Sequence, residues 1–123
     1  PHCLLAADTM LPASGQGALG IQIREGDEAT LAKIALLHHA PTALCVGAER
    51  ALIGHLEAGC QTPVAAFAEI KANNTLSLWG RVGAAIEAQH TGPIDDPDTL
   101  VATVLQDLLA QGAKTYLEQE QWR

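Results

Sequence analysis

Three stretches in the middle of the chain alternate hydrophobic and polar positions with a period of two. They cover residues 64–70, 76–82 and 86–91, with the turn-forming residues Asn73 and Gly83 between them. A period of two places successive side chains on opposite faces of a strand, and short turns join neighbouring strands antiparallel. The pattern therefore predicts a three-stranded antiparallel sheet with one face that needs a cover.

Helical periodicity flanks these strands. Asp27 predicts the start of a first helix that ends before Pro41, and Thr42 predicts the cap of a second helix that ends at Gly59. Acidic residues around Pro97 predict the start of one long last helix, whose apolar stripe continues past Gly112. We expect an α+β fold in which the helices pack on one face of the sheet.

The first 24 residues follow a different pattern. A glycine-rich stretch at residues 14–20 precedes an alternating run in which Leu19, Ile21 and Ile23 point the same way. This run predicts a stray strand that needs a sheet not supplied nearby. Residues 15–20 satisfy GxGxxG literally, but a dinucleotide fingerprint follows a strand and opens a helix, so we interpret them as a tight turn. The chain also starts without Met, and we expect it to be a fragment of a longer protein.

Composition and charge exclude several classes of partner. Hydrophobic residues make up 48% of the chain and aromatic residues 3%, so the core must be aliphatic. The net charge is −7, and the Lys and Arg residues are scattered, which argues against nucleic acid and against an anionic membrane. No apolar run reaches the ~18–20 residues of a membrane span, and no signal-peptide pattern opens the chain. We expect a cytoplasmic protein.

The chain has three cysteines without CxxC spacing, which suggests neither a disulfide framework nor a thiol-redox motif. Cys45 lies on a helical apolar stripe and is interpreted as a core thiol. Cys60 stands between loop-forming residues, where a thiol can reach solvent. Adjacent His38 and His39 point about 100° apart on a helix, so we expect no metal site there.

The residues alone leave alternatives open. Cys60 is a functional attachment point, an ordinary loop thiol in a non-enzymatic interaction module, or a redox-reactive thiol, although no resolving cysteine has suitable spacing. Glu49 and Arg50 lie together in the second predicted helix. Arg50 either pairs locally or meets another domain.

Three blocks carry a resemblance to a known family. They are MLPASGQGALGI at residues 10–21, AERA at residues 48–51, and LEAGCQTPV at residues 56–64. In their order and spacing they closely resemble the C-terminal part of the porphobilinogen deaminase family, also called hydroxymethylbilane synthases. The resemblance extends through the three predicted strands to near the end of the chain.

The resemblance implies a concrete chemistry. Enzymes of this family are transferases that condense four porphobilinogen molecules, with loss of ammonia, into hydroxymethylbilane on the route to haem. Their dipyrromethane cofactor is held by a thioether to a loop cysteine, which here would be Cys60. Gln16 and Gly17 match the family's GQG turn and would contact pyrrole carboxylates along the cofactor cleft.

The chain also departs from the family. Ala58 stands where most members have the first of two glycines before the cysteine. The family's catalytic aspartate and carboxylate-binding arginines lie in two domains that precede this part, so the resemblance implies no catalytic residue in this chain and no activity of the chain alone. It assigns residues 1–24 to the remnant of a preceding domain and residues 25–123 to the cofactor-attachment domain. Porphobilinogen and the linear tetrapyrrole would reach Cys60 through the absent domains.

Overall fold

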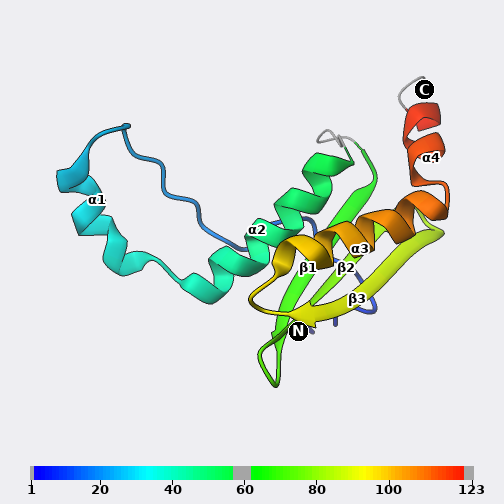
Figure 1. Cartoon of the computed structure of the whole chain (residues 1–123), viewed down its shortest axis with the longest axis horizontal. Helices are drawn as coiled ribbons and strands as arrows, with labels where there is room; N and C mark the ends of the chain where they lie inside the picture. The colour runs from blue at the N-terminus through cyan, green and yellow to red at the C-terminus, as the bar shows by residue number, and fades with distance from the viewer. Residues whose placement is uncertain (1, 57–61, 121–123) are drawn as a thin grey trace.

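The computed structural model describes residues 2–56 and 62–120. In chain order (Figure 1), the elements are α1 (Glu28–Ile34), the 3₁₀ helix η1 (Ala35–Leu37), α2 (Ala40–His55), β1 (Val64–Lys71), β2 (Thr75–Val82), β3 (Ile86–Pro93), α3 (Pro97–Ala110) and α4 (Ala113–Glu120).

The three strands form one antiparallel sheet in the order β1-β2-β3. In the register of the sheet, Ala68 of β1 lies opposite Leu78 of β2, which lies opposite His90 of β3. The period-two prediction for all three strands is confirmed. The sheet and the helices packed against it confirm the α+β fold class.

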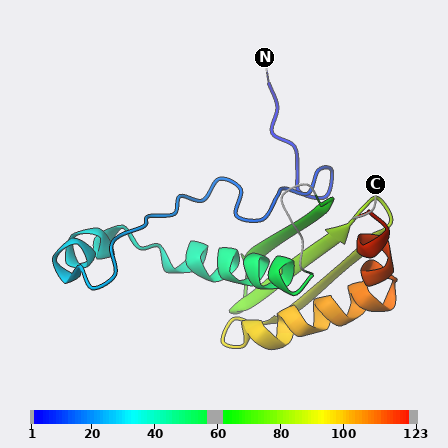
Figure 2. The ribbon, with the colours of Figure 1, turned by 90° about the horizontal axis from the view of Figure 1, so that it is seen from above.

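The core lies between one face of the sheet and the helices α2 and α3 (Figures 1 and 2). It is aliphatic, as the composition predicts. Its largest fully buried side chains are Leu52, Leu76, Leu78, Leu108, Val82 and Val104. Gly80 of β2 lies under two of them, since a Cβ atom built on it would come within 2.8 Å of Leu52 Cδ2 and 3.0 Å of Leu108 Cδ1. The glycine lets both helices approach the sheet closely.

The opposite face of the sheet carries polar and aromatic side chains. Phe67 and Trp79 lie opposite each other in the register of β1 and β2. Residues 6–8 of the N-terminal segment lie over this face (Figure 2) and close a hollow of about 190 Å³ with both aromatic side chains. The helices thus cover one face, while the N-terminal segment covers part of the other.

Residues 19–23 form no strand within the described chain, and their predicted pairing with a sheet of a preceding domain stays a prediction. This segment is extended but pairs with no described strand, and Leu19 is 96% and Ile21 55% exposed. An alternating sequence forms a strand only where a neighbour takes up its backbone groups. Helix α1 follows this segment, has no buried residue and lies away from the sheet (Figure 1). The assignment of residues 1–24 to a separate domain stays a prediction.

Two helix predictions need correction. Helix α2 begins at Ala40 rather than after Thr42, because His39 Nδ1 accepts from the Thr42 N–H and Pro41 fits the first turn. The predicted long last helix is two helices, since Gly112 has φ +95° and ends the first of them. The predicted caps Asp27 and Asp96 are confirmed by their hydrogen bonds to backbone N–H groups.

No single helix in the described ranges is long and apolar enough to cross a membrane. The pair Glu28–Leu37 and Ala40–His55 meets the length and composition requirement only when taken together, and it is bent by 100°.

Candidate functional site

A glycine-rich turn (residues 13–18) forms one side of the candidate site. Gly15 and Gly17 adopt φ values of +68° and +82°, which favour glycine. The Gln16 N–H donates to the Ala13 carbonyl at 3.1 Å, and the Ala18 N–H donates to the Gly15 carbonyl at 3.1 Å. Gln16 Oε1 also accepts from the Ala13 N–H at 3.0 Å. Two successive turns therefore shape the segment that sequence analysis interprets as a tight turn.

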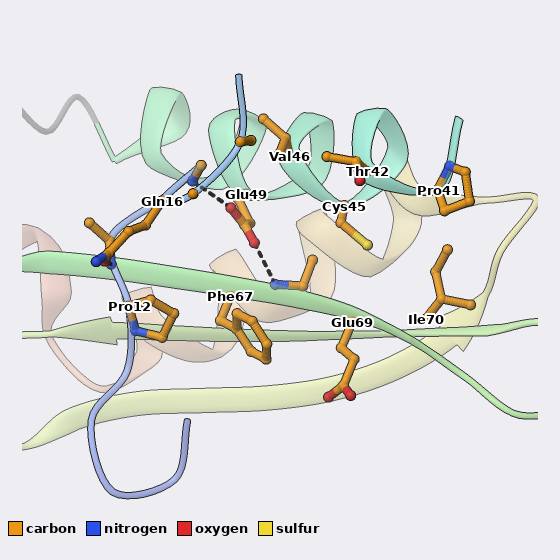
Figure 3. Close-up of a pocket in the computed structure, with 15 residues that line it drawn as sticks. Pro12, Gln16, Pro41, Thr42, Cys45, Val46, Glu49, Phe67, Glu69 and Ile70 are labelled. Atoms are coloured by element: carbon orange, nitrogen blue, oxygen red, sulfur yellow. Dashed lines mark hydrogen bonds between the residues drawn. The ribbon is translucent and has the colours of Figure 1, made fainter. Parts of the chain in front are cut away.

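Glu49 of α2 holds this turn (Figure 3). Its side chain is buried, with the residue only 6% exposed. One carboxylate oxygen, Oε2, accepts from the Gly15 N–H at 2.6 Å, while Oε1 accepts from the Ala68 N–H at 2.9 Å. Because Ala68 donates to Glu49, its N–H faces the open edge of β1. The carboxylate thus joins the glycine-rich turn, α2 and β1.

Sequence reasoning left the role of Glu49 open. Its neighbour Ala48 is buried on the apolar side of this helix together with Leu52, and the glutamate lies beside them. A carboxylate next to a buried stripe must find donors, because burying an unsatisfied charge is costly. That signal could have marked Glu49 as a bridging residue, although it could not have named the partners. Arg50, the next residue, is exposed.

A pocket of about 440 Å³ lies between the glycine-rich turn, the N-terminal part of α2 and residues 67–70 of β1 (Figure 3). Glu49 and Glu69 line it, and no Lys or Arg does. Glu69 already pairs with Lys71 at 2.7 Å near solvent. Two carboxylates without a lining cation mean that the described part of the pocket cannot by itself neutralise an anionic ligand.

The described cysteines differ in environment. Cys3 is exposed, whereas Cys45 is half-buried between α2 and β1. Burial, and next the negative charge of Glu49, raise the pKa of the Cys45 thiol. A raised pKa keeps the sulfur protonated and a poor nucleophile. Cys45 is therefore a packing thiol, as its stripe predicts.

Gln16 and Gly17 lie exposed on the glycine-rich turn. Gln16 Oε1 is taken by the turn itself, which leaves its amide NH₂ as the group available to a ligand. No hydrogen bond in the part of the chain that the structure describes uses the Gly17 N–H, and a Cβ atom built on Gly17 would meet nothing within 4 Å. Both groups are hydrogen-bond donors with open approach.

Cys60, the predicted attachment residue, lies outside the described residues. The structure describes the flanking segments: α2 ends at His55 and β1 begins at Val64. Within the described ranges, no three His, Cys, Asp or Glu side chains come together as a metal site. His90 instead contacts Asp107, with 2.8 Å between His90 Nε2 and Asp107 Oδ2. The roles of Cys60, Gln16 and Gly17 stay predictions.

Comparison with known proteins identifies the family. The family model of the porphobilinogen deaminase C-terminal domain matches residues 43–110. The porphobilinogen deaminase of Syntrophotalea carbinolica is 43% identical over 118 residues, which cover 92% of this chain and 37% of that protein. The porphobilinogen deaminase of Brevibacillus brevis is 44% identical over 112 residues, which cover 89% of this chain and 36% of that protein.

A third relative, the porphobilinogen deaminase of Gloeobacter violaceus, is 40% identical over 121 residues, covering 94% of this chain and 37% of that protein. The chain thus spans 36–37% of the length of these three curated relatives. The matched region contains most of α2, the whole sheet and α3, as well as Cys60. On this match, the chain belongs to the porphobilinogen deaminase family and carries that family's C-terminal domain.

Proposed function

We propose that this chain is the cofactor-carrying part of a cytoplasmic hydroxymethylbilane synthase, which condenses four porphobilinogen molecules into hydroxymethylbilane with loss of ammonia. The family match over residues 43–110 carries this proposal. The sequence AGCQTP at residues 58–63, in which loop-forming residues flank a cysteine, gives additional support.

Cys60 is the proposed attachment residue for dipyrromethane. The bound group would serve as the primer to which the growing pyrrole chain is added. A thioether suits a tether of this kind, because it is stable in water through repeated turnovers. Cys45 is the alternative attachment residue, but its partial burial and the raised pKa of its thiol argue against this role.

The glycine-rich turn would contribute binding rather than proton transfer. The Gly17 N–H and the Gln16 amide NH₂ would donate to carboxylates of the bound pyrroles. The turn at residues 13–18 has amide groups and the buried Ser14 hydroxyl, and it carries no acidic or basic side chain that could serve proton transfer. We therefore assign the catalytic acid, and the cations that neutralise most of the pyrrole carboxylates, to the part of the family's length that this chain does not span. The exposed Leu19 and Ile21 would pair into a sheet of that part.

An activity assay tests the proposal. The chain is joined to the portion of the Brevibacillus brevis protein that precedes its matching region, and porphobilinogen consumption is measured. We expect turnover in the joined protein, loss of turnover in Cys60→Ser, and retained turnover in the matched variant Cys45→Ser. The chain alone should be inactive. Turnover by the chain alone, or full activity of Cys60→Ser, contradicts the proposal.

A further inference from the structure

We infer that Glu49 is a positioning residue that fixes the glycine-rich turn against the two elements flanking residues 57–61. This inference rests on the proposed function, because it assigns Glu49 a part in placing Gln16 and Gly17, the proposed pyrrole-binding donors, against α2 and β1. The observation behind it is the buried Glu49 carboxylate, which accepts hydrogen bonds from two backbone N–H groups in different segments.

The two donors come from distant parts of the chain. Gly15 lies 34 residues before Glu49, and Ala68 lies 19 residues after it. Neither hydrogen bond is a local helix or turn contact. The carboxylate therefore acts as a three-way joint between the glycine-rich turn, α2 and β1 (Figure 3).

A carboxylate suits this joint better than any other side chain of its size. It has two acceptor oxygens and no donor, so both N–H groups are satisfied at once by charge-assisted hydrogen bonds. A glutamine side chain has one acceptor oxygen, and its NH₂ group would face the second N–H. Replacement by glutamine therefore keeps the size and breaks one of the two contacts.

Two of the three parts that Glu49 joins are α2 and β1, the elements that flank residues 57–61 in the chain. Helix α2 carries Glu49 and ends less than two turns later at His55, while β1 begins at Val64 and carries Ala68. Gln16 and Gly17 follow directly after Gly15, the residue that Glu49 holds. Without the two Glu49 hydrogen bonds, the turn would no longer be held in place against α2 and β1. A displacement of its donor groups by about 1 Å is enough to lower the rate ~100-fold.

Hydrogen exchange of the 123-residue chain tests the joint itself. Gly15 lies outside helices and strands, so the wild-type Gly15 amide should be protected only if Glu49 holds it. Glu49→Gln should speed exchange at Gly15 about 10- to 100-fold, while amides of α3 keep their wild-type rates. Glu69→Gln is the matched control, because it removes an equivalent charge from the same pocket without touching the joint.

The exchange result can overturn the inference even if the variant does not fold. An unprotected Gly15 amide in the wild-type chain refutes the joint. Unchanged Gly15 exchange in folded Glu49→Gln refutes it as well.

Kinetics of the joined protein test the positioning role. At a temperature at which all variants are folded, kcat/KM should fall about 10- to 100-fold in Glu49→Gln. It should stay within about twofold in Glu87→Gln, which changes an exposed carboxylate of β3 outside the pocket. Glu49→Asp, which keeps both acceptors on a shorter stem, should restore part of the loss. A purely structural role would change the melting temperature and leave kcat/KM unchanged. An inactive wild-type joined protein would refute the proposed function, while the Gly15 exchange result would still decide the joint.

Discussion

Substitution of Gly80 by Ala tests how the helices pack on the sheet. The added Cβ would lie 2.8 Å from Leu52 Cδ2, 3.0 Å from Leu108 Cδ1 and 3.4 Å from Val104 Cγ1. All three neighbours are fully buried at 0% exposure, so none can swing into solvent. Either the side chains leave their preferred rotamers, or α2 and α3 move away from β2.

The expected magnitude follows from two opposing terms. Overpacking a filled core costs about 1–3 kcal/mol. Replacing Gly by Ala restricts the unfolded chain and returns about 0.4–1 kcal/mol. The 2.8 Å contact places the overpacking cost in the upper part of its range, about 2–3 kcal/mol. The free energy of unfolding should therefore fall by about 1–2.5 kcal/mol, which lowers the melting temperature of a domain of this size by roughly 4–10 °C.

Urea denaturation followed by circular dichroism measures this change, and Gly92→Ala provides the control. A Cβ on Gly92 of β3 would lie 3.5 Å from Leu100 Cβ, which is ordinary contact, so this variant should be as stable as the wild type or up to about 1 kcal/mol more stable. A Gly80→Ala protein as stable as the wild type would refute the packing argument. So would an equal loss in both variants.

Two further predictions concern titratable groups. Asp96 caps α3, and its hydrogen bonds to Thr99 lower the pKa of its carboxyl group. Because the pKa of Asp96 is lower in the folded state, its ionised carboxylate stabilises the folded protein. This contribution is fully present above the unfolded-state pKa of about 3.9 and is lost as the pH falls through the folded-state pKa. The acid side of the stability curve should therefore flatten in Asp96→Asn, which keeps a capping side chain without the charge; an unchanged slope contradicts this assignment. For the thiols, burial and the charge of Glu49 raise the pKa of Cys45, so iodoacetamide at neutral pH should alkylate Cys45 at least tenfold more slowly than exposed Cys3. Equal rates, followed by mass spectrometry of the separated peptides, would contradict the interpretation of Cys45 as a packing thiol.

Local patterns predict the parts of this fold that depend on local physics. The period of two predicts all three strands, because short turns bring each strand directly to its neighbour. The caps Asp27 and Asp96 are also predictable, since a cap contacts a backbone N–H only three residues away. The break at Gly112 has a sequence signal in glycine itself, but an apolar stripe that continues past it hides the signal.

Distant partners explain what the sequence does not predict. The strand pattern at residues 19–23 is real, but a strand forms only where another strand is present to pair with it. Glu49 reaches donors 34 residues before it and 19 residues after it, and no periodicity encodes such a meeting. The candidate site is therefore predictable as a set of motifs, whereas the residue that joins two of its parts is visible only in the folded chain.

Mass spectrometry of the active joined protein identifies the cysteine that carries the cofactor. Trypsin cuts after Lys and Arg, so it separates the three cysteines into peptides 1–24, 34–50 and 51–71 of this chain. If Cys60 holds the cofactor, peptide 51–71 carries a dipyrromethane adduct, which is lost in Cys60→Ser and kept in Cys45→Ser. An adduct on peptide 34–50, or an active protein whose peptide 51–71 carries an unmodified Cys60, would contradict attachment at Cys60.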